Sequence, residues 1–336
     1  MRRIRARLPE GPGIVVGPGD DAAAVETGPL TLLTTDSLVE GTHFKLEWSP
    51  PRLVGRKALT VSLSDVVAMA GMPRFAMVSL VLPPDVKLEF VDGLYDGLLE
   101  RAAEAGVGLV GGNVCASSTD IVIDVVLVGQ GDALLKRSGA QPGDLVVVTG
   151  TLGAAAAGVA LLAQGARLHD DAFLASTGLW TESSAEAVVH CLRAALDPAP
   201  PLALGRALSE HDIAHAGIDL SDGLSGDLLH VCEESGVAAR IDAASVPVDP
   251  HAAKLARAQG SAGLQLALHG GEDYQLLLAV PPERVDALRD LAVVWELPLT
   301  VVGEFLEGAP GLTLRKESGE EPLEPGSFEH FLRPAR

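Results

Sequence analysis

The sequence predicts a mixed α/β or α+β fold with two domains. Apolar runs of strand length alternate with longer Ala- and Leu-rich segments whose apolar residues recur at helical spacing. The chain has 336 residues, and since a domain typically has about 150 residues, this length suits two domains. Hydrophobic residues make up 47% and charged residues 21%, a globular balance that excludes disorder for most of the chain. Only 4% of the residues are aromatic, so we expect a core of Ala, Val and Leu.

Strands are predicted where short apolar runs, several of them rich in Val and Ile, lie between turn signals. These runs are Leu30–Thr35, Ile121–Gly129, Leu145–Thr149, Ala214–Ile218, Gln275–Val280 and Leu299–Phe305. Helices are predicted over residues 53–70, 86–105, 154–164, 183–195, 224–234 and 283–293. The first helix places Leu59, Leu63 and Val66 on one face, and it ends before Gly71 and Pro73.

The domain boundary is predicted in the segment RSGAQPGD at 137–144. This segment holds two Gly and one Pro between strand runs, which is turn chemistry. We therefore expect one domain over residues 1–138 and a second over residues 139–336. The polar stretch 166–182 and the Pro-rich run DPAPP at 197–201 are two further, weaker candidates for a boundary.

The charge balance limits the kinds of partner. Acidic residues outnumber Lys and Arg by 45 to 25, a net charge of −20, which opposes nucleic acid or an anionic membrane and suits a protein that collects cations. The three cysteines form no CxxC pair, so neither a zinc site nor a disulfide framework is predicted. No apolar run reaches about 18 residues, and the basic start lacks an apolar segment behind it. We expect no membrane helix, no signal peptide and a location in the cytoplasm.

The common nucleotide and hydrolase motifs are absent. The sequence contains no GxxxxGK[ST], no GxSxG and no HExxH. The run VVVTGTLGAAAAG at 146–158 indicates a strand, a Gly turn and a helix, but it lacks the full GxGxxG. It therefore favours a tight strand-to-helix turn over a dinucleotide site.

Acidic residues instead gather where strands end or Gly turns begin. The segments are GPGDDAAAV with Asp20 and Asp21, LLTTDSLVEGTHF with Asp36 and His43, TVSLSDVVAMAG with Asp65, GIDLSDGLSGDL with Asp219 and Asp222, and GGEDYQLLL with Glu272 and Asp273. Carboxylate and hydroxyl oxygens are the ligands that Mg²⁺ prefers, and it often bridges one or two carboxylates to substrate phosphates. Gly turns and helix N-termini supply backbone N–H groups for such phosphates. The repetition predicts a Mg-nucleotide site without a P-loop.

Each acidic segment also has a structural explanation. Asp222 stands before a helix and, taken alone, favours an N-cap. The Asp pair in GPGDDAAAV can form an Asx turn, the acids of GGEDY can be solvated at a strand start, and His43 can be structural. Asp65 lies in an apolar helix, where a carboxylate without a partner is costly to bury. Ser62, three residues earlier on the same face, is its candidate partner.

Seven motifs follow one another along the chain: GPGDDAAAV, TTDSLVEGTHF, KALTVSLSDVVAMAGMP, LVGGN, KRSGAQPGDLVVVTGTLG, IDLSDGLSGDL and GGEDYQLLL. Together they resemble the thiamine-monophosphate kinases, a family of the aminoimidazole ribonucleotide synthetase superfamily. The resemblance runs from about residue 10 to SFEHF at 327–331. It implies ATP-dependent phosphorylation of thiamine monophosphate to thiamine diphosphate with Mg²⁺. It also implies a homodimer whose N-terminal α/β domains pair through their sheets, and a C-terminal α/β domain that completes the substrate site.

The resemblance further implies roles for single residues by their motif positions. Mg²⁺ would be held by residues from Asp20, Asp21, Thr35, Asp36, Asp65, Asn113, Asp219 and Asp222. ATP would contact Thr34, Thr35, Gly112, Asn113, Arg137 and Ser221. Thiamine monophosphate would contact His43, Glu272 and Phe328. Catalysis would rest on Asp36, Asp222 and Arg137, which neutralise charge and position the phosphates for direct in-line transfer.

Three positions depart from the family pattern. Asn113 stands where the family usually has the Asp of GGD, Ala105 replaces a nearby Tyr, and Pro201 stands where an Arg is usual. Two alternatives therefore stay open, namely another ATP-using synthetase of the superfamily and a non-catalytic Mg-nucleotide-binding paralogue. Selenophosphate synthetase is disfavoured because the first cysteine is Cys115, and the hydrogenase-maturation relative is disfavoured because the sequence ends in LRPAR.

Overall fold

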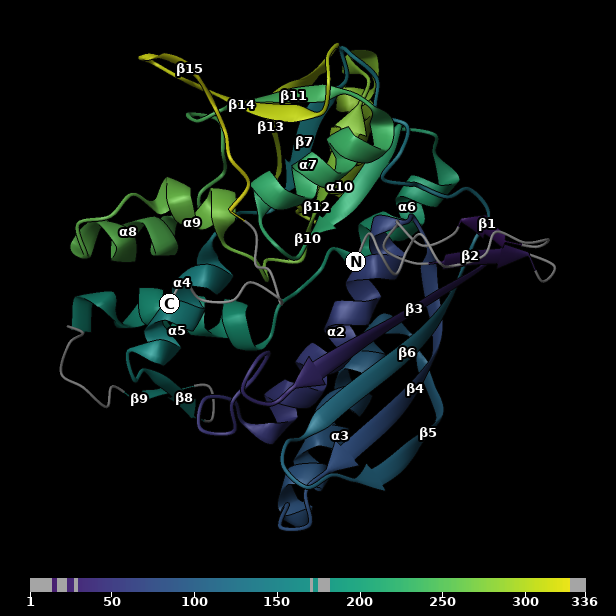
Figure 1. Ribbon diagram of the computed structural model, residues 1–336, viewed down its shortest axis with the longest axis vertical. Helices are drawn as coiled ribbons and strands as arrows, with labels where there is room; N and C mark the ends of the chain where they lie inside the picture. Colours follow the sequence, from purple (N-terminus) through teal and green to yellow (C-terminus); the bar gives the residue numbers. More distant parts are fainter. Residues whose placement is uncertain (1–13, 17–22, 27–29, 170–171, 175–181, 327–336) are drawn as a thin grey trace.

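The computed structural model describes residues 14–16, 23–26, 30–169, 172–174 and 182–326. It contains two large sheets that follow one another in sequence (Figure 1). Helices flank both sheets, so the predicted α/β class is confirmed. The turn segment 137–144 lies between the last strand of the first sheet and the first strand of the second. The division of the chain at residue 138 stays a prediction.

The first sheet has the strand order β1-β2-β3-β6-β4-β5. Its strands are β1 (Ile14–Val16), β2 (Ala23–Glu26), β3 (Leu30–Val39), β4 (Met72–Leu82), β5 (Gly108–Ala116) and β6 (Val122–Gly131). Neighbours are antiparallel except β4 and β5, which are parallel. Helices α2 (Pro51–Ala68) and α3 (Leu88–Ala105) cover one face (Figure 1). Along β3, Leu32 and Thr34 are buried under these helices, whereas Leu33 and Thr35 point to the exposed face.

Helix α2 is the element shared by both domains. Against α3 its backbone approaches so closely that a Cβ on Gly55 would lie 1.9 Å from the carbonyl oxygen of Leu94, so only glycine fits there. Its C-terminal end packs against the second domain, where Val67 and Ala68 join a core with Leu204. The helix is therefore buried on nearly all sides, and its polar residues must find partners inside the protein.

The second sheet has the strand order β10-β12-β7-β13-β11-β14-β15. Its strands are β7 (Leu145–Thr149), β10 (Ala216–Leu220), β11 (Ala238–Asp242), β12 (Gln275–Val280), β13 (Leu299–Leu306), β14 (Gly311–Lys316) and β15 (Gly319–Pro322). Helices α7 (Leu224–Ser235) and α9 (Gly263–His269) pack on one face. Helices α6 (Leu202–Glu210) and α10 (Val285–Val293) pack on the other, and the short η1 (Pro282–Arg284) directly precedes α10. Both faces are buried, which explains why β7 and β12 are continuous apolar runs in the sequence.

A third group of helices lies beside the sheets and forms its own apolar core (Figure 1). It consists of α4 (Ala154–Ala163), α5 (Glu182–Leu196) and α8 (Pro250–Ala258), with the hairpin β8 (Arg167–His169) and β9 (Ala172–Leu174). Trp48 and Leu53 of the first domain pack against this core. None of the described helices is both long enough and apolar enough to cross a membrane.

Candidate active site

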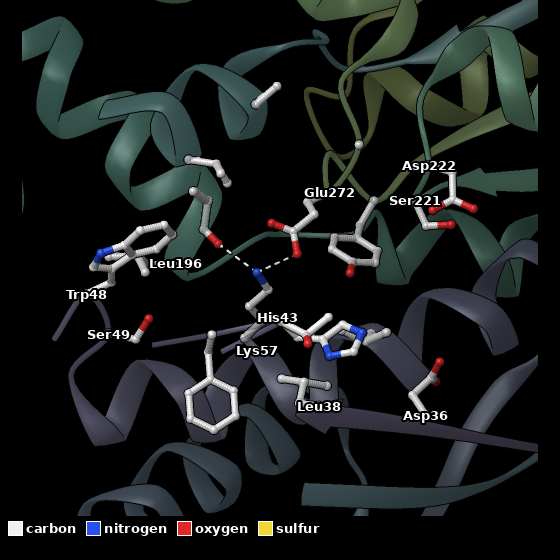
Figure 2. A pocket seen from close by; sticks show the side chains of 18 of the residues that line it. Asp36, Leu38, His43, Trp48, Ser49, Lys57, Leu196, Ser221, Asp222 and Glu272 are labelled. Atoms are coloured by element: carbon white, nitrogen blue, oxygen red, sulfur yellow. Dashed lines mark hydrogen bonds and ion pairs between the residues drawn. The ribbon is translucent and has the colours of Figure 1, made fainter. Parts of the chain in front are cut away.

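A cavity of about 1050 Å³ collects predicted site residues from both domains (Figure 2). Its wall comes from β3 and the loop after it, from α2, α4 and α5, and from the loops after β10 and α9. The predicted site residues on this wall are Thr35, Asp36, His43, Ser221, Asp222 and Glu272. Trp48, Val159, Leu162 and Leu196 add an apolar part. The structure thus brings together acidic and apolar surface that lie far apart in the sequence.

Hydroxyl groups connect the acidic residues of the two sheets through α2. Ser62 Oγ donates to Asp36 Oδ2 of β3 at 2.8 Å, and Ser64 Oγ donates to Asp219 Oδ2 of β10 at 2.7 Å. Asp65 accepts from Thr34 Oγ1 at 2.5 Å, so its partner is Thr34 and the prediction that it pairs with Ser62 is wrong. Helix α2 lies between the two sheets and contacts a carboxylate on each. Ser62 bonds Asp36 of the first sheet, and Ser64 bonds Asp219 of the second.

Tyr274 lies among these carboxylates. Burial raises the pKa of its phenol well above the ordinary value, and the negative charges of Glu272, Asp219, Asp36 and Asp65 raise it further. Four carboxylates from four segments of the chain therefore lie near one buried side chain. Such a concentration of negative charge favours bound cations in this region.

Asp222 is not the cap of α7. The N-cap residue is Gly223, and the buried Asp227 carboxylate accepts the backbone N–H groups of Asp222 and Gly223, both at 3.1 Å. Asp227 thus accepts the N–H groups at the start of α7, and the Asp222 side chain lies on the cavity wall. The capping explanation offered by the sequence is wrong, and the ligand explanation remains.

The GGEDY loop has a strained backbone beside the cavity. Glu272 and Tyr274 have φ angles of 71° and 49°, in the left-handed region that non-glycine residues rarely adopt. Two backbone hydrogen bonds hold the loop against β10, from Glu272 N–H to Ser221 O at 2.8 Å and from Tyr274 N–H to Leu220 O at 2.9 Å. These bonds fix where the Glu272 side chain leaves the backbone.

The neighbouring Asp273 serves a different purpose. Its carboxylate accepts the N–H groups of Gly153 at 2.7 Å and Ala155 at 3.3 Å, at the N-terminus of α4. The N-terminus of α4 is therefore occupied by the protein's own carboxylate. This supports the structural interpretation of the VVVTGTLGAAAAG run, because a phosphate would need the same donors.

The cavity also contains a residue that the sequence analysis missed. Lys57 lies inside α2, is 6% exposed, and donates from Nζ to Glu272 Oε1 at 2.7 Å (Figure 2). The signal was a Lys followed by the apolar run Ala58–Leu59 in a helix with few charged residues. A lysine in that setting is almost never fully buried without a partner.

His43 has both a structural and a cavity-facing role. Its Nδ1 accepts the backbone N–H of Val39 at 3.0 Å, which fixes the turn after β3. In the neutral ring the proton is therefore on Nε2. The ring lines the cavity together with Glu272 and Lys57 (Figure 2).

Other predicted site residues lie outside the cavity wall. Asn113 is exposed on the edge strand β5, and the strand register places it in one row with Ser79, Asp124 and Ser37. Gly112 allows β5 to approach β4, because a Cβ there would lie 1.9 Å from the Val78 carbonyl oxygen. Within one chain, this row lies on the sheet face opposite to α2.

Arg137 lies in the segment between the sheets, half-buried, and its carbonyl oxygen accepts from Ser235 Oγ. It is not part of the cavity wall. Asp20, Asp21 and Phe328 lie outside the described residues. Their predicted roles, like those of Arg137, Gly112 and Asn113, stay predictions.

Comparison with known proteins places the chain in a family. Residues 19–131 match the AIR synthase related protein N-terminal domain, and residues 141–314 match the corresponding C-terminal domain. The thiamine-monophosphate kinase of Aquifex aeolicus (strain VF5) is 33% identical over 93% of this chain and 92% of its own length. That of Bacillus subtilis (strain 168) is 32% identical over 94% of this chain and 93% of its own length. The chain belongs to the thiamine-monophosphate kinase family.

Solved structures agree with this assignment. A structure described as AaThiL complexed with AMPPCP and TMP superposes with a TM-score of 0.83, at 32% identity over 98% of this chain and 95% of that one. The thiamine monophosphate kinase of Stenotrophomonas maltophilia K279a gives a TM-score of 0.75, at 33% identity over 93% and 94%. The hydrogenase maturation protein HypE in complex with ATP shares the fold alone, with a TM-score of 0.67 at 19% identity over 98% and 95%.

The donor set of the cavity fits a hard divalent cation. Among the described residues, no three His, Cys, Asp or Glu side chains converge closely enough to hold a metal by themselves. Asp36 and Asp222 nevertheless both line the cavity, together with the hydroxyl-bearing Thr35 and Ser221. Mg²⁺ commonly takes only one or two carboxylates and completes its shell with water and substrate phosphates, so this oxygen-rich wall suits it.

Proposed function

We propose that this protein transfers the γ-phosphoryl group of ATP to thiamine monophosphate, giving thiamine diphosphate and ADP. The observation that carries the proposal is the convergence of Asp36, His43, Asp222 and Glu272 on one cavity. The family relationship supports it, as does the likeness to a structure described as a complex with AMPPCP and TMP. A cavity of about 1050 Å³ is large enough for two small-molecule substrates.

Mg²⁺ would be held by Asp36, Asp222 and Thr35 on the cavity wall, with Asp65 and Asp219 behind them. When bound, it neutralises the charge that otherwise keeps two polyanionic substrates apart. The hydroxyl groups of Ser62 and Ser64 orient the carboxylates of Asp36 and Asp219, so α2 sets the geometry of the acidic group. Ser221 lies next to Asp222 on the wall, where it can donate to a nucleotide phosphate.

The other side of the cavity suits the thiamine part of the acceptor. Trp48 and Leu196 offer apolar surface for its rings, and Lys45 Nζ lies 4.2 Å from the centre of the Trp48 ring. The Glu272 carboxylate complements the positive charge of a thiazolium ring, and His43 Nε2–H can donate to the acceptor. Phe328 is proposed to close this side.

The reaction needs no strong general base. A phosphate monoester has its second pKa near 6, so the attacking phosphate oxygen is already largely unprotonated at neutral pH. We propose direct in-line transfer between the two substrates, in which Asp36 and Asp222 position charge and Arg137 adds a cation.

We also propose a homodimer that pairs through the first sheets. The sheet face opposite to α2 exposes Leu33, Phe75 and Met77 at 37%, 44% and 41%, an apolar area that a monomer would leave in water. Thr35 and Ser37 lie on this face and also line the cavity, so a second chain packed there would border the cavity. The row of Asn113 would be buried in the same contact.

A location in the cytoplasm is the third part of the proposal. Cys191 and Cys232 are buried free thiols whose pKa values burial raises to about 12, so they pack as apolar side chains. Cell fractionation with an antibody against the chain tests this location, and recovery in an exported fraction would contradict it.

Steady-state turnover with ATP and thiamine monophosphate tests the reaction. The proposal predicts equal amounts of ADP and thiamine diphosphate, with activity that depends on Mg²⁺. ATP binding without turnover would favour the non-catalytic paralogue. ATP hydrolysis that is not stimulated by thiamine monophosphate would favour a synthetase with another acceptor.

A further inference from the structure

Lys57 is a positively charged side chain buried in the middle of α2, at 6% exposure. Its ammonium group donates to Glu272 Oε1 at 2.7 Å and to the carbonyl oxygen of Ala195 at 3.2 Å (Figure 2). Ala195 lies in the last turn of α5, where unpaired carbonyl groups and the helix dipole favour a cation. Lys57 thus ties together α2, the end of α5 and the GGEDY loop.

Glu272 depends on this lysine for its orientation. Among the described residues, Lys57 is the one side chain that bonds the Glu272 carboxylate. The backbone of Glu272 is held in the left-handed region, but a glutamate side chain with three rotatable bonds can still point in many directions. The ion pair with Lys57 holds the Glu272 carboxylate in one of these directions, beside the cavity.

We propose that Lys57 is a positioning residue that holds the Glu272 carboxylate for the cationic thiamine part of the substrate. This inference rests on the proposed function. Lys57 itself carries the same sign of charge as a thiazolium ring, so a direct contact with that ring would be repulsive. Its side chain is only 8% exposed, and its bonds run to Glu272 and Ala195, so it acts through Glu272.

Ligand affinities separate this role from a direct contact with the substrate phosphate. We would measure the dissociation constants of thiamine monophosphate, thiamine and AMPPCP by calorimetry for the wild type, Lys57→Met, Glu272→Gln and the double variant. A positioning role predicts that Lys57→Met weakens thiamine and thiamine monophosphate by the same factor, about tenfold, with AMPPCP unchanged. It also predicts that the double variant binds no more weakly than Glu272→Gln.

A matched control comes from the surface of the second sheet. Lys316 pairs with Glu321 on the exposed β14–β15 hairpin, and Lys316→Met should leave all three affinities unchanged. Thermal unfolding checks that Lys57→Met folds. If Lys57→Met does not fold, Lys57→Gln replaces it, because the uncharged amide NH2 can still donate hydrogen bonds in place of the ammonium group. The expected loss is then smaller but still equal for the two thiamine ligands.

Three results would overturn the inference. Weakened binding of thiamine monophosphate with unchanged binding of thiamine would assign Lys57 to the phosphate. Additive losses in the double variant would show that Lys57 acts independently of Glu272, and wild-type affinity in Lys57→Met would show that it has no role. Failure of the wild type to bind thiamine monophosphate would contradict the proposed function itself, which the first titration shows separately.

Discussion

Asp273 is a carboxyl group that connects the GGEDY loop to the N-terminus of α4. Burial of the carboxyl group raises its pKa from 3.8 to about 7, although the N–H groups of Gly153 and Ala155 favour the charged form. In the unfolded chain the same group ionises near its ordinary value. Its contribution to stability is therefore greatest below about pH 3.8 and is lost as the pH rises to about 7.

Asp273→Asn should remove this pH dependence, because an amide does not titrate and can still accept an N–H. We expect the free energy of unfolding of the wild type to fall relative to that of the variant between about pH 4.5 and about pH 7. Above about pH 7 the difference between the two proteins should stay constant. Urea unfolding at a series of pH values measures the difference. Curves that stay parallel across the whole range would show that Asp273 is ionised throughout.

The acidic residues on the cavity wall give a second prediction. Asp36→Asn and Asp222→Asn should each lower kcat by roughly 100-fold or more, because charge stabilisation at the reacting phosphates is lost. The melting temperature should change little, since an amide oxygen can still accept the hydrogen bond of Ser62 at Asp36. Asp96→Asn, an exposed change on α3, is the control and should keep full activity. Near-normal turnover at saturating Mg²⁺ in either cavity variant would reject the assignment.

Helix α2 holds the two domains together through polar contacts inside an apolar setting. Ser64 is fully buried and donates to Asp219, which is itself only 3% exposed. Removing a donor from a buried carboxylate costs more than the hydrogen bond itself, because the acceptor stays desolvated.

Ser64→Ala should therefore lower the free energy of unfolding by about 1–3 kcal/mol. Ser209→Ala is the matched control, since Ser209 is partly exposed on α6 and donates only to the carbonyl oxygen of Arg206. Its effect should stay within about 0.5 kcal/mol. Urea unfolding measures both losses. Equal losses in the two variants would show that the hydrogen bond between α2 and β10 contributes no more to stability than an exposed one.

Elements with a clear apolar pattern could be predicted from the sequence, and the others could not. Helices α2 to α5, α7 and α10 lie within a few residues of their predictions, and the strand predicted at Ala214–Ile218 is β10, two residues later. Strand β5 was missed because it is an exposed edge strand with three glycines and almost no alternation. Strand β4 was missed because it begins with the pair Met72–Pro73, which indicates a turn.

The site could be predicted as a set of residues but not as an arrangement. Acids placed after apolar runs and Gly turns indicated Asp36, Asp222 and Glu272. The strand end predicted at Thr35 is wrong, because β3 continues to Val39 and Asp36 lies within it, paired with Val125 of β6. The partners of these acids depend on tertiary contacts. Lys57 meets Glu272 across 215 positions of sequence, and Asp227 replaces Asp222 as the group that serves α7. Neither fact follows from local pattern.

The association of two chains is the prediction for the molecule as a whole. Met77 lies on the exposed sheet face. Replacing it by Asp should prevent pairing, because the new carboxylate would be desolvated in the dimer interface without a partner. We expect the wild type to sediment as a dimer and Met77→Asp as a monomer. Leu99→Asp, which is 54% exposed on α3 at the other side of this domain, should stay dimeric. A wild type that sediments as a monomer at micromolar concentration would contradict the pairing.

Transfer of label from [γ-³²P]ATP tests most directly whether the cavity of this chain is a phosphotransferase site that acts on thiamine monophosphate. The enzyme would be incubated with labelled ATP, Mg²⁺ and thiamine monophosphate, and the products separated by chromatography. We predict that the label moves to thiamine diphosphate, that no label stays on the protein, and that Asp222→Asn loses the transfer. Label recovered only as inorganic phosphate, or bound to the protein, would contradict direct transfer between the two substrates.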